Sequence, residues 1–447
     1  MNDTKFAQNH LAKPLEDIVH GLIYLYILTI PLQSIGFKFT ELFVGLPEIV
    51  FLVLAPLAII YIMRSGQKLW IDSLDLFVFG WLLANILAGW FAGFDLIVIT
   101  QIIKTAYLVV LYMILKWTIS PKMLTRIVKT IILSSLIAAL TGIMGFGLGY
   151  IGIETFLAIK RPYPYLIHVI QAQGFTPSPN MLASIIMIGI FFQTHEILNN
   201  KIFKAYNALI IIILLIGIIL TFSKTISLLI LGIILIWSSA RKQQLLPFYH
   251  IFIRTVVIGY VIIYVFATHI LIVSKNQNLE ILREEKYIAG ALVSETDHFE
   301  FYPTQYTQLK IISIHGIVQS FPWGLGAGKF NNFAHGLKEN YSYRTHVPYP
   351  DPHSTYLGTF AELGVAGFCF LLAIFITVGN NIYKILIVMK QHSSLVIILG
   401  IGFTVISLEA INTDIMNFRH YWVLISIIGV LCKYSRTEAK VSKSHTI

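Results

Sequence analysis

Residues 206–238 read YNALIIIILLIGIILTFSKTISLLILGIILIWS, and this stretch decides the fold. It contains two apolar runs, 206–222 and 224–238, which meet at the short sequence TFSKT, where Lys224 is the only charged residue. Runs that approach about 20 apolar residues can cross a hydrocarbon core about 30 Å thick. Because the connection is so short, the two runs must form a hairpin of neighbouring membrane-spanning helices.

The rest of the chain repeats this pattern. Of its 447 residues, 56% are hydrophobic and only 12% are charged, and its mean hydropathy is +0.76. Ordinary soluble domains have about 25% charged residues. The sequence therefore predicts an all-α polytopic membrane protein with about twelve transmembrane helices. We expect the helices near 18–37, 45–63, 75–92, 95–115, 128–150, 180–195, 206–222, 224–238, 250–274, 353–379, 394–411 and 420–433.

The distribution of Lys and Arg predicts the orientation. If the N-terminus is cytoplasmic, every segment on that side has at least two basic residues, and the C-terminus is cytoplasmic too. The short loops on the opposite side carry only Lys38, Lys160, Arg161, Lys224 and Arg419. The net charge of +10 thus reflects membrane topology, and we expect no nucleic-acid partner.

Two connections on the non-cytoplasmic side are longer than turns. One is 151–179, which is rich in Pro and aromatic residues; the other is 275–352, between the ninth and tenth helices. Within the second, we expect a helix at 278–297 and an amphipathic helix at 304–321, at the membrane surface or capping the bundle. We therefore expect a single membrane domain, 1–447, with 275–352 as an embedded, partly helical extracytoplasmic subdomain.

The sequence PHSTYLGTFAELGVAG, residues 352–367, opens the tenth predicted helix. Asp351 can cap this helix, and His353 then stands at its outer end. A neutral imidazole there could accept a proton from a hydroxyl as a general base, or it could be an interfacial His with a structural role. Glu362 lies about 13 Å deeper on an ideal helix, just before Gly364, and a structural role is the favoured interpretation.

Other polar residues lie at the outer helix ends. Lys224 either extends to the lipid phosphates or binds a substrate diphosphate. Asn180, in GFTPSPNMLA, either caps a helix or belongs to an anion site at the helix start, with Lys160 and Arg161 just upstream. Lys104 lies inside a predicted helix and needs a carboxylate or polar cavity. Glu48, Glu409 and Asp414 are possible partners.

TFSKT, GFTPSPN, PWGLGAGKF and PHSTYLGTFAELGVAG resemble the motifs of the O-antigen ligase and O-antigen polymerase superfamily of bacterial envelope glycosyltransferases. The His-started motif is the most specific of them, and the resemblance covers most of the chain. It implies transfer of a glycan from a polyprenyl (undecaprenyl) diphosphate carrier to a sugar hydroxyl, at the outer face of the bacterial inner membrane. The acceptor would be lipid A–core in a ligase, or another lipid-linked glycan in a polymerase.

The resemblance also implies roles for individual residues. His353 would be the catalytic base and Lys224 a diphosphate contact, in an inverting reaction without a metal or other cofactor. The family usually has Arg at the position of Lys224, and Lys keeps the charge but loses the bidentate fork. It also tends to have Arg in the amphipathic helix of the long loop. Here Lys310 or Gln308 could take that place, or Arg283 could fold back from the preceding segment.

Two other classes of function compete with this interpretation. A lipid-linked-sugar transporter or flippase fits twelve helices, but transporters often have two related halves, and the long loop divides this chain unequally. A scaffold for envelope assembly is the other alternative. The two cysteines, Cys369 and Cys432, lie in apolar segments and indicate neither a disulfide framework nor a metal site.

Overall fold

A computed structural model describes most of the chain. The described residues are 2–39, 42–66, 69–163, 166–199, 205–240, 247–275, 293–341, 351–388 and 393–444. Within them the protein is mostly helical, as the apolar runs predict.

A helix lies at each of the predicted membrane spans. These helices are α1 (Asn2–Thr29), α2 (Leu46–Ser65), α3 (Ser73–Ala92), α4 (Leu96–Thr118), α5 (Pro121–Tyr150), α6 (Pro179–Asn199), α7 (Ala205–Ile219), α8 (Thr225–Ala240), α9 (Pro247–His269), α13 (Thr355–Val388), α14 (Ser393–Glu409) and α15 (Arg419–Ser444). In the described part of the chain, 7 helices are long and apolar enough to cross a membrane, and shorter apolar helices accompany them. The chain is thus a multi-pass membrane protein, while the number twelve stays a prediction.

Side chains fix where several helices begin. Asp72 and Asp75 accept each other's backbone N–H groups at 2.8 and 3.2 Å, which forms a capping box at the start of α3. Asp95 caps α4, and Glu48 accepts the N–H of Gly45 before α2. Each contact satisfies a backbone donor that the first helical turn leaves free.

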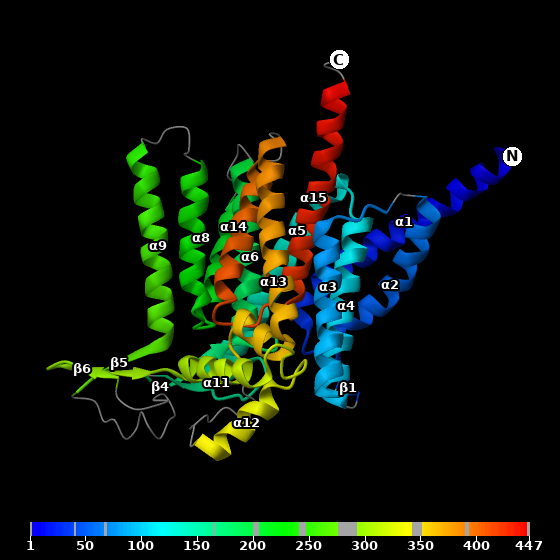
Figure 1. Cartoon of the computed structure of the whole chain (residues 1–447). Helices are drawn as coiled ribbons and strands as arrows, with labels where there is room; N and C mark the ends of the chain where they lie inside the picture. Colours follow the sequence, from blue (N-terminus) through cyan, green and yellow to red (C-terminus); the bar gives the residue numbers. More distant parts are fainter. Residues whose placement is uncertain are drawn as a thin grey trace.

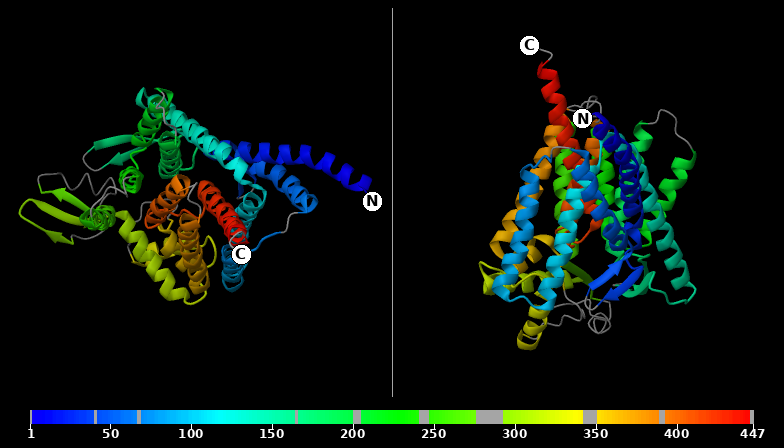
Figure 2. Two further views of the ribbon diagram at one scale, coloured as in Figure 1. Left: turned by 90° about the horizontal axis from the view of Figure 1, so that it is seen from above. Right: turned by 90° about the vertical axis from the view of Figure 1, so that its right-hand side faces the viewer.

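The helices form a bundle in which most run side by side (Figure 1), with α14 and α15 in the middle when it is seen from above (Figure 2). α13 packs against α3, α14 and α15. Tyr421 and Trp422 of α15 are completely buried, whereas Leu52 and Met63 of α2 are more than half exposed. Large apolar side chains on the outside are what a lipid-facing surface requires.

The start of α1 and the end of α15 lie at one end of the bundle, which we call the terminal end (Figure 1). The other end, here called the loop end, carries two crosswise helices, α11 (Gln305–Ser320) and α12 (Phe330–Tyr341). It also carries antiparallel strands: β1 (Gly36–Phe39) with β2 (Leu42–Gly45), β3 (Ala158–Tyr163) with β4 (Leu166–Ala172), and β7 (Phe299–Pro303) between β5 (Ile270–Ser274) and β6 (Ser294–Glu295).

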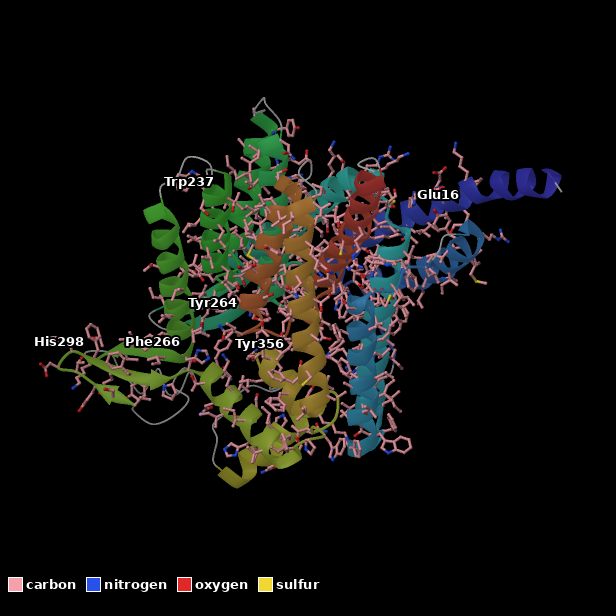
Figure 3. The ribbon with its side chains drawn as sticks, turned by 45° about the horizontal axis from the view of Figure 1, so that its top comes forward. Glu16, Trp237, Tyr264, Phe266, His298 and Tyr356 are labelled. Atoms are coloured by element: carbon pink, nitrogen blue, oxygen red, sulfur yellow. The ribbon has the colours of Figure 1, made fainter. Side chains whose placement is uncertain are left out.

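These strands correct the all-α prediction. The Pro- and aromatic-rich segment 151–179 forms the β3–β4 hairpin, and the three-stranded sheet projects from the bundle with His298 at its tip (Figure 3). The amphipathic helix expected at 304–321 is present as α11. The helix expected at 278–297 lies largely outside the described residues, and its last part is strand β6 instead.

Candidate functional site

The turn between α7 and α8 holds Lys224 at the loop end. Ser223 donates a hydrogen bond to Oδ1 of Asn180 at 2.9 Å, and its oxygen also accepts the N–H of Thr225 at 3.2 Å. Ser178, not Asn180, caps α6, because its hydroxyl accepts the N–H of Met181. Asn180 is therefore a neighbour of the Lys224 turn, to which it is joined through Ser223.

Helix α11 brings a second lysine toward this turn. Tyr306 and Lys310 are four residues apart and so share one face of the helix. The ammonium of Lys224 lies 4.4 Å from the ring centre of Tyr306. Lys310 contacts Nε2 of His269 at 2.6 Å and donates to Oδ1 of Asn412 at 2.9 Å. Side chains from the α7–α8 turn, α9, α11 and the α14–α15 loop thus meet in one cluster.

The cluster is electrically unbalanced. No carboxylate forms a salt bridge with either lysine among the described residues. The pKa of Lys224 is lowered to about 8, mainly by loss of water around its ammonium and further by the nearby charge of Lys310. The residue nevertheless stays exposed at the surface. Partial burial likewise lowers the pKa of Lys310 to about 8. Two cations that disfavour each other's charge form a site that an anion would stabilise.

His353 stands beside this cluster. Its ring lies 5.1 Å from that of Tyr306, centre to centre, and its φ of 43° is unusual for a residue with a side chain. Oδ1 of Asp351 accepts both the backbone N–H and Nδ1–H of His353, each at 2.7 Å. Burial raises the pKa of Asp351, but its contacts with His353 outweigh this and lower it overall. Nε2 of His353 is thereby left as the ring nitrogen that can accept a proton.

This geometry corrects the expected role of Asp351. Helix α13 begins at Thr355, and Ser354 contacts its first turn, with its Oγ 3.4 Å from the N–H of Leu357. Asp351 therefore orients His353 rather than capping the helix.

Glu362 holds the Gly-rich turn, residues 322–330, against α13. Its Oε1 accepts the N–H of Phe330 at 3.1 Å, and its backbone carbonyl accepts the N–H of Gly326 at 2.9 Å. A kink in α13 at Gly364 then lets Val365 donate to the carbonyl of Pro322 at 3.0 Å. These contacts give Glu362 and Gly364 structural roles in holding the Gly-rich turn at the loop end.

Gly364→Ala is expected to destabilise this contact. Gly364 has a φ of 63°, and a Cβ there would collide with the carbonyl oxygen of Pro322. The strain should lower the free energy of unfolding by about 1–3 kcal/mol, measured as a lower thermal midpoint in detergent. Gly379→Ala is the control, because it is in the same helix and a Cβ there meets nothing within 4 Å. Equal midpoints for the two variants would contradict the docking described here.

The structure does not unite all the residues that the sequence singled out. Lys160 is exposed on β3, and within the described chain no hydrogen bond or ion pair joins it to the cluster; Arg161 follows it on the strand. Gln308 is buried at the loop end, and its Oε1 has no hydrogen-bond partner among the residues that the structure describes. Arg283 lies outside the described residues. Of the three alternatives for the family's Arg, Lys310 is therefore the one that the structure places near Lys224.

Among the described residues, no salt bridge joins Lys104 to a carboxylate, which was one of the two surroundings expected for it. Glu48 binds Arg419 through Nε at 2.6 Å, and Glu409 is hydrogen-bonded to Ser184 and Thr225. Lys104 is exposed on α4. An exposed lysine can extend its ammonium toward polar surroundings, so its position inside a helix does not by itself require a carboxylate.

Three members of the cluster were not predicted: Tyr306, His269 and Asn412. Tyr306 precedes Lys310 by one helical turn, a spacing that could have been noticed in the amphipathic segment. His269 lies near the end of the predicted helix 250–274, and Asn412 follows the predicted helix 394–411, in a distant part of the chain. Only the packing of α9, α11 and α14 at the loop end brings them together.

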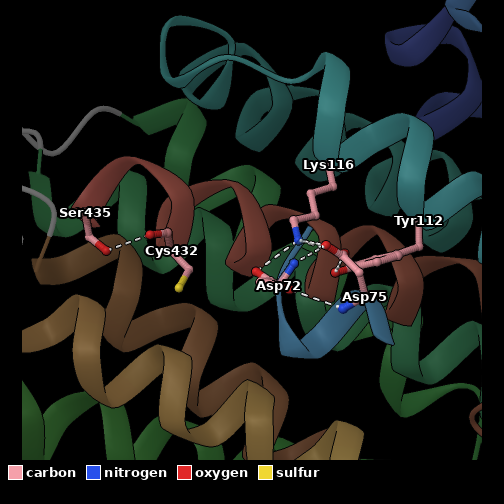
Figure 4. Close-up of polar contacts among 6 residues, drawn as sticks. All are labelled: Asp72, Asp75, Tyr112, Lys116, Cys432 and Ser435. Atoms are coloured by element: carbon pink, nitrogen blue, oxygen red, sulfur yellow. Dashed lines mark hydrogen bonds and ion pairs between the residues drawn. The ribbon is translucent and has the colours of Figure 1, made fainter. Parts of the chain in front are cut away.

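A second polar cluster lies where α3 begins and α4 ends (Figure 4). Lys116 is fully buried and lies 2.7 Å from Asp75 and 3.0 Å from Asp72, while Tyr112 donates to Asp75. Lys116 is paired with both carboxylates inside the protein, so this cluster links α3 to α4 and leaves no cation for a ligand. Among the described residues, no group of three His, Cys, Asp or Glu could hold a metal ion.

Comparison with known protein families finds a match to part of the chain. Residues 209–372 match the model of a family described as O-antigen ligase. The matched range runs from α7 into α13 and contains Lys224, His269, Tyr306, Lys310 and His353. A search of curated proteins finds no match.

Proposed function

We propose that this chain transfers a glycan between lipid-linked molecules, because residues 209–372 match the O-antigen ligase family. The donor would be a glycan on a polyprenyl (undecaprenyl) diphosphate carrier. The acceptor would be a sugar hydroxyl of lipid A–core, in lipopolysaccharide or surface polysaccharide synthesis. In this proposal the loop end faces outward from the bacterial inner membrane, and both termini are cytoplasmic.

One observation carries the proposal: an oriented histidine lies next to two lysines that have no carboxylate partner in the described structure. The rings of His353 and Tyr306 are 5.1 Å apart, and Lys224 is 4.4 Å from the ring of Tyr306. A base and a concentrated positive charge are the two groups that displacement of a diphosphate requires. A transporter would need the charge but not the oriented base.

The proposed reaction is a direct displacement. Nε2 of His353 takes the proton of the acceptor hydroxyl while its oxygen attacks the anomeric carbon. The bond from that carbon to the diphosphate oxygen breaks, and the leaving diphosphate keeps the electron pair. Lys224 and Lys310 stabilise the added negative charge, and Asp351 stabilises the imidazolium that forms. Because attack and departure occur on opposite faces of the sugar, the anomeric configuration inverts.

Deletion of the gene, followed by gel electrophoresis of surface polysaccharide, tests this proposal. Loss of attached chains would support a ligase. Single units that remain attached while long chains disappear would support a polymerase of the same superfamily. An unchanged polysaccharide pattern would contradict both and favour transport.

Donor binding should depend on the charge of the lysines. A bound diphosphate favours the protonated form, so affinity should be highest below about pH 8 and fall as the pH rises through the pKa of about 8 of Lys224 and Lys310. Lys224→Arg should retain binding and make the alkaline decline shallower, because Arg stays protonated. Titrations from about pH 6.5 to about 9.5 measure this. Loss of binding in Lys224→Arg would instead indicate a lysine held by packing.

A further inference from the structure

We infer that Glu409 is a positioning residue that fixes the Lys224 turn for a lipid diphosphate. This inference rests on the proposed function. Glu409 ends α14 and is only 1% exposed. Its Oε1 lies 2.9 Å from Oγ1 of Thr225, within hydrogen-bond distance, and its Oε2 accepts a hydrogen bond from Ser184, also at 2.9 Å. One buried carboxyl group thus joins α14 to α8 and α6.

The connection continues through the turn itself. Thr225 Oγ1 lies 2.9 Å from Ser223 Oγ, which lies 2.9 Å from Asn180 Oδ1. Lys224 is the residue between Ser223 and Thr225, so both of its neighbours in the chain belong to this row of hydrogen bonds. The direction in which the ammonium leaves the turn is therefore set by the buried row that ends at Glu409.

The number of protons available in the row of hydrogen bonds indicates the protonation state of Glu409. Each hydroxyl has one proton to donate. If Asn180 presents Oδ1, Ser223 donates to Asn180 and Thr225 donates to Ser223, so Thr225 must receive a proton from Glu409. A neutral carboxylic acid supplies it, and the described residues place no cation in a salt bridge with Glu409. Burial without a cation also favours the neutral form.

If Glu409 is neutral, replacing it with Gln and replacing it with Ala should have clearly different effects. Gln has the same shape, and its amide can donate to Thr225 while its carbonyl accepts from Ser184. Glu409→Gln should therefore bind undecaprenyl diphosphate within about twofold of the unchanged protein. Glu409→Ala should bind it about tenfold more weakly and raise the KM for the donor without a matching fall in kcat.

The full chain in nanodiscs, titrated with undecaprenyl diphosphate, provides the measurement. Thr225→Val breaks the link to the turn, whereas Ser184→Ala breaks the link to α6. We expect about tenfold weaker binding in the first and about twofold or less in the second. This pair decides the question if Glu409→Ala does not fold. Thr404→Val, on the exposed side of α14, is the matched control and should bind normally.

Contradictory results would be specific. Equal losses in Thr225→Val and Ser184→Ala, or a loss in Glu409→Gln as large as that in Glu409→Ala, would overturn the positioning role. If these variants bind normally while Lys224→Ala does not, the proposed function stands and the role of Glu409 fails. If the unchanged protein does not bind undecaprenyl diphosphate, both fail.

Discussion

His353→Ala should remove glycan transfer while leaving the protein folded and inserted. A positioned general base accelerates a reaction by about 10²–10⁴-fold. Among the described residues, His353 alone combines a proton-accepting nitrogen with a carboxylate partner, Asp351, and a ring contact with Tyr306. The residue lies before α13 begins and is partly exposed, so its loss leaves no large cavity. The measurement is kcat for transfer from an undecaprenyl diphosphate-linked glycan, with the amount of folded protein determined separately.

Two further variants sharpen this test. Asp351→Asn should reduce kcat less than His353→Ala, because the imidazole remains but its orientation and charge are less well supported. His298→Ala, at the tip of the three-stranded sheet, should leave kcat unchanged (Figure 3). Normal transfer by His353→Ala would exclude it as the base and return it to a structural role at the membrane interface.

Replacement of both Lys224 and Lys310 with Ala should abolish binding of the lipid diphosphate. A hydrogen bond to a charged group contributes about 1.5–3 kcal/mol, so each lysine should account for roughly 10- to 150-fold in affinity. The two effects should not add, because the charges act on each other and on one ligand. The double variant removes two cations that repel in the free protein, which offsets the loss of the hydrogen bonds from Lys310 to His269 and Asn412; the thermal midpoint measures the balance.

Lys275→Ala is the matched control for the double variant. Lys275 is also at the loop end but forms a salt bridge with Glu295 at 3.0 Å, so its charge is already balanced. It should bind undecaprenyl diphosphate normally. Equal affinity in the double variant and the control would show that the lysine cluster is not the diphosphate site.

The sequence was most informative where local pattern determines structure. Continuous apolar runs predicted the positions of the helices, and the unusual charge in TFSKT drew attention to Lys224. The amphipathic pattern of 304–321 predicted α11, and Lys310 was one of three alternatives for the missing Arg. These signals are strong in a membrane protein because burying a polar group in a membrane-spanning segment costs free energy. A polar residue in such a segment is therefore a candidate for a function.

Other features depend on tertiary contacts that local pattern does not determine. The sequence allows Asp351 to cap α13. In the structure the chain turns at His353, and Ser354 takes the position next to the helix. Tyr306 lies between lysine and histidine only because α11 runs across the bundle end. The β3–β4 hairpin was missed because Pro and aromatic residues in 151–179 show no clear alternation of apolar and polar positions.

The central claim is that the cluster of Lys224, Lys310 and His353 breaks a glycan–diphosphate bond. The most direct measurement uses purified protein in vesicles with an undecaprenyl diphosphate-linked glycan and an acceptor glycolipid. One molecule of free undecaprenyl diphosphate is expected for each glycan joined to the acceptor, and neither product is expected with His353→Ala. Movement of intact donor across the vesicle membrane, with no diphosphate lipid released, would contradict it.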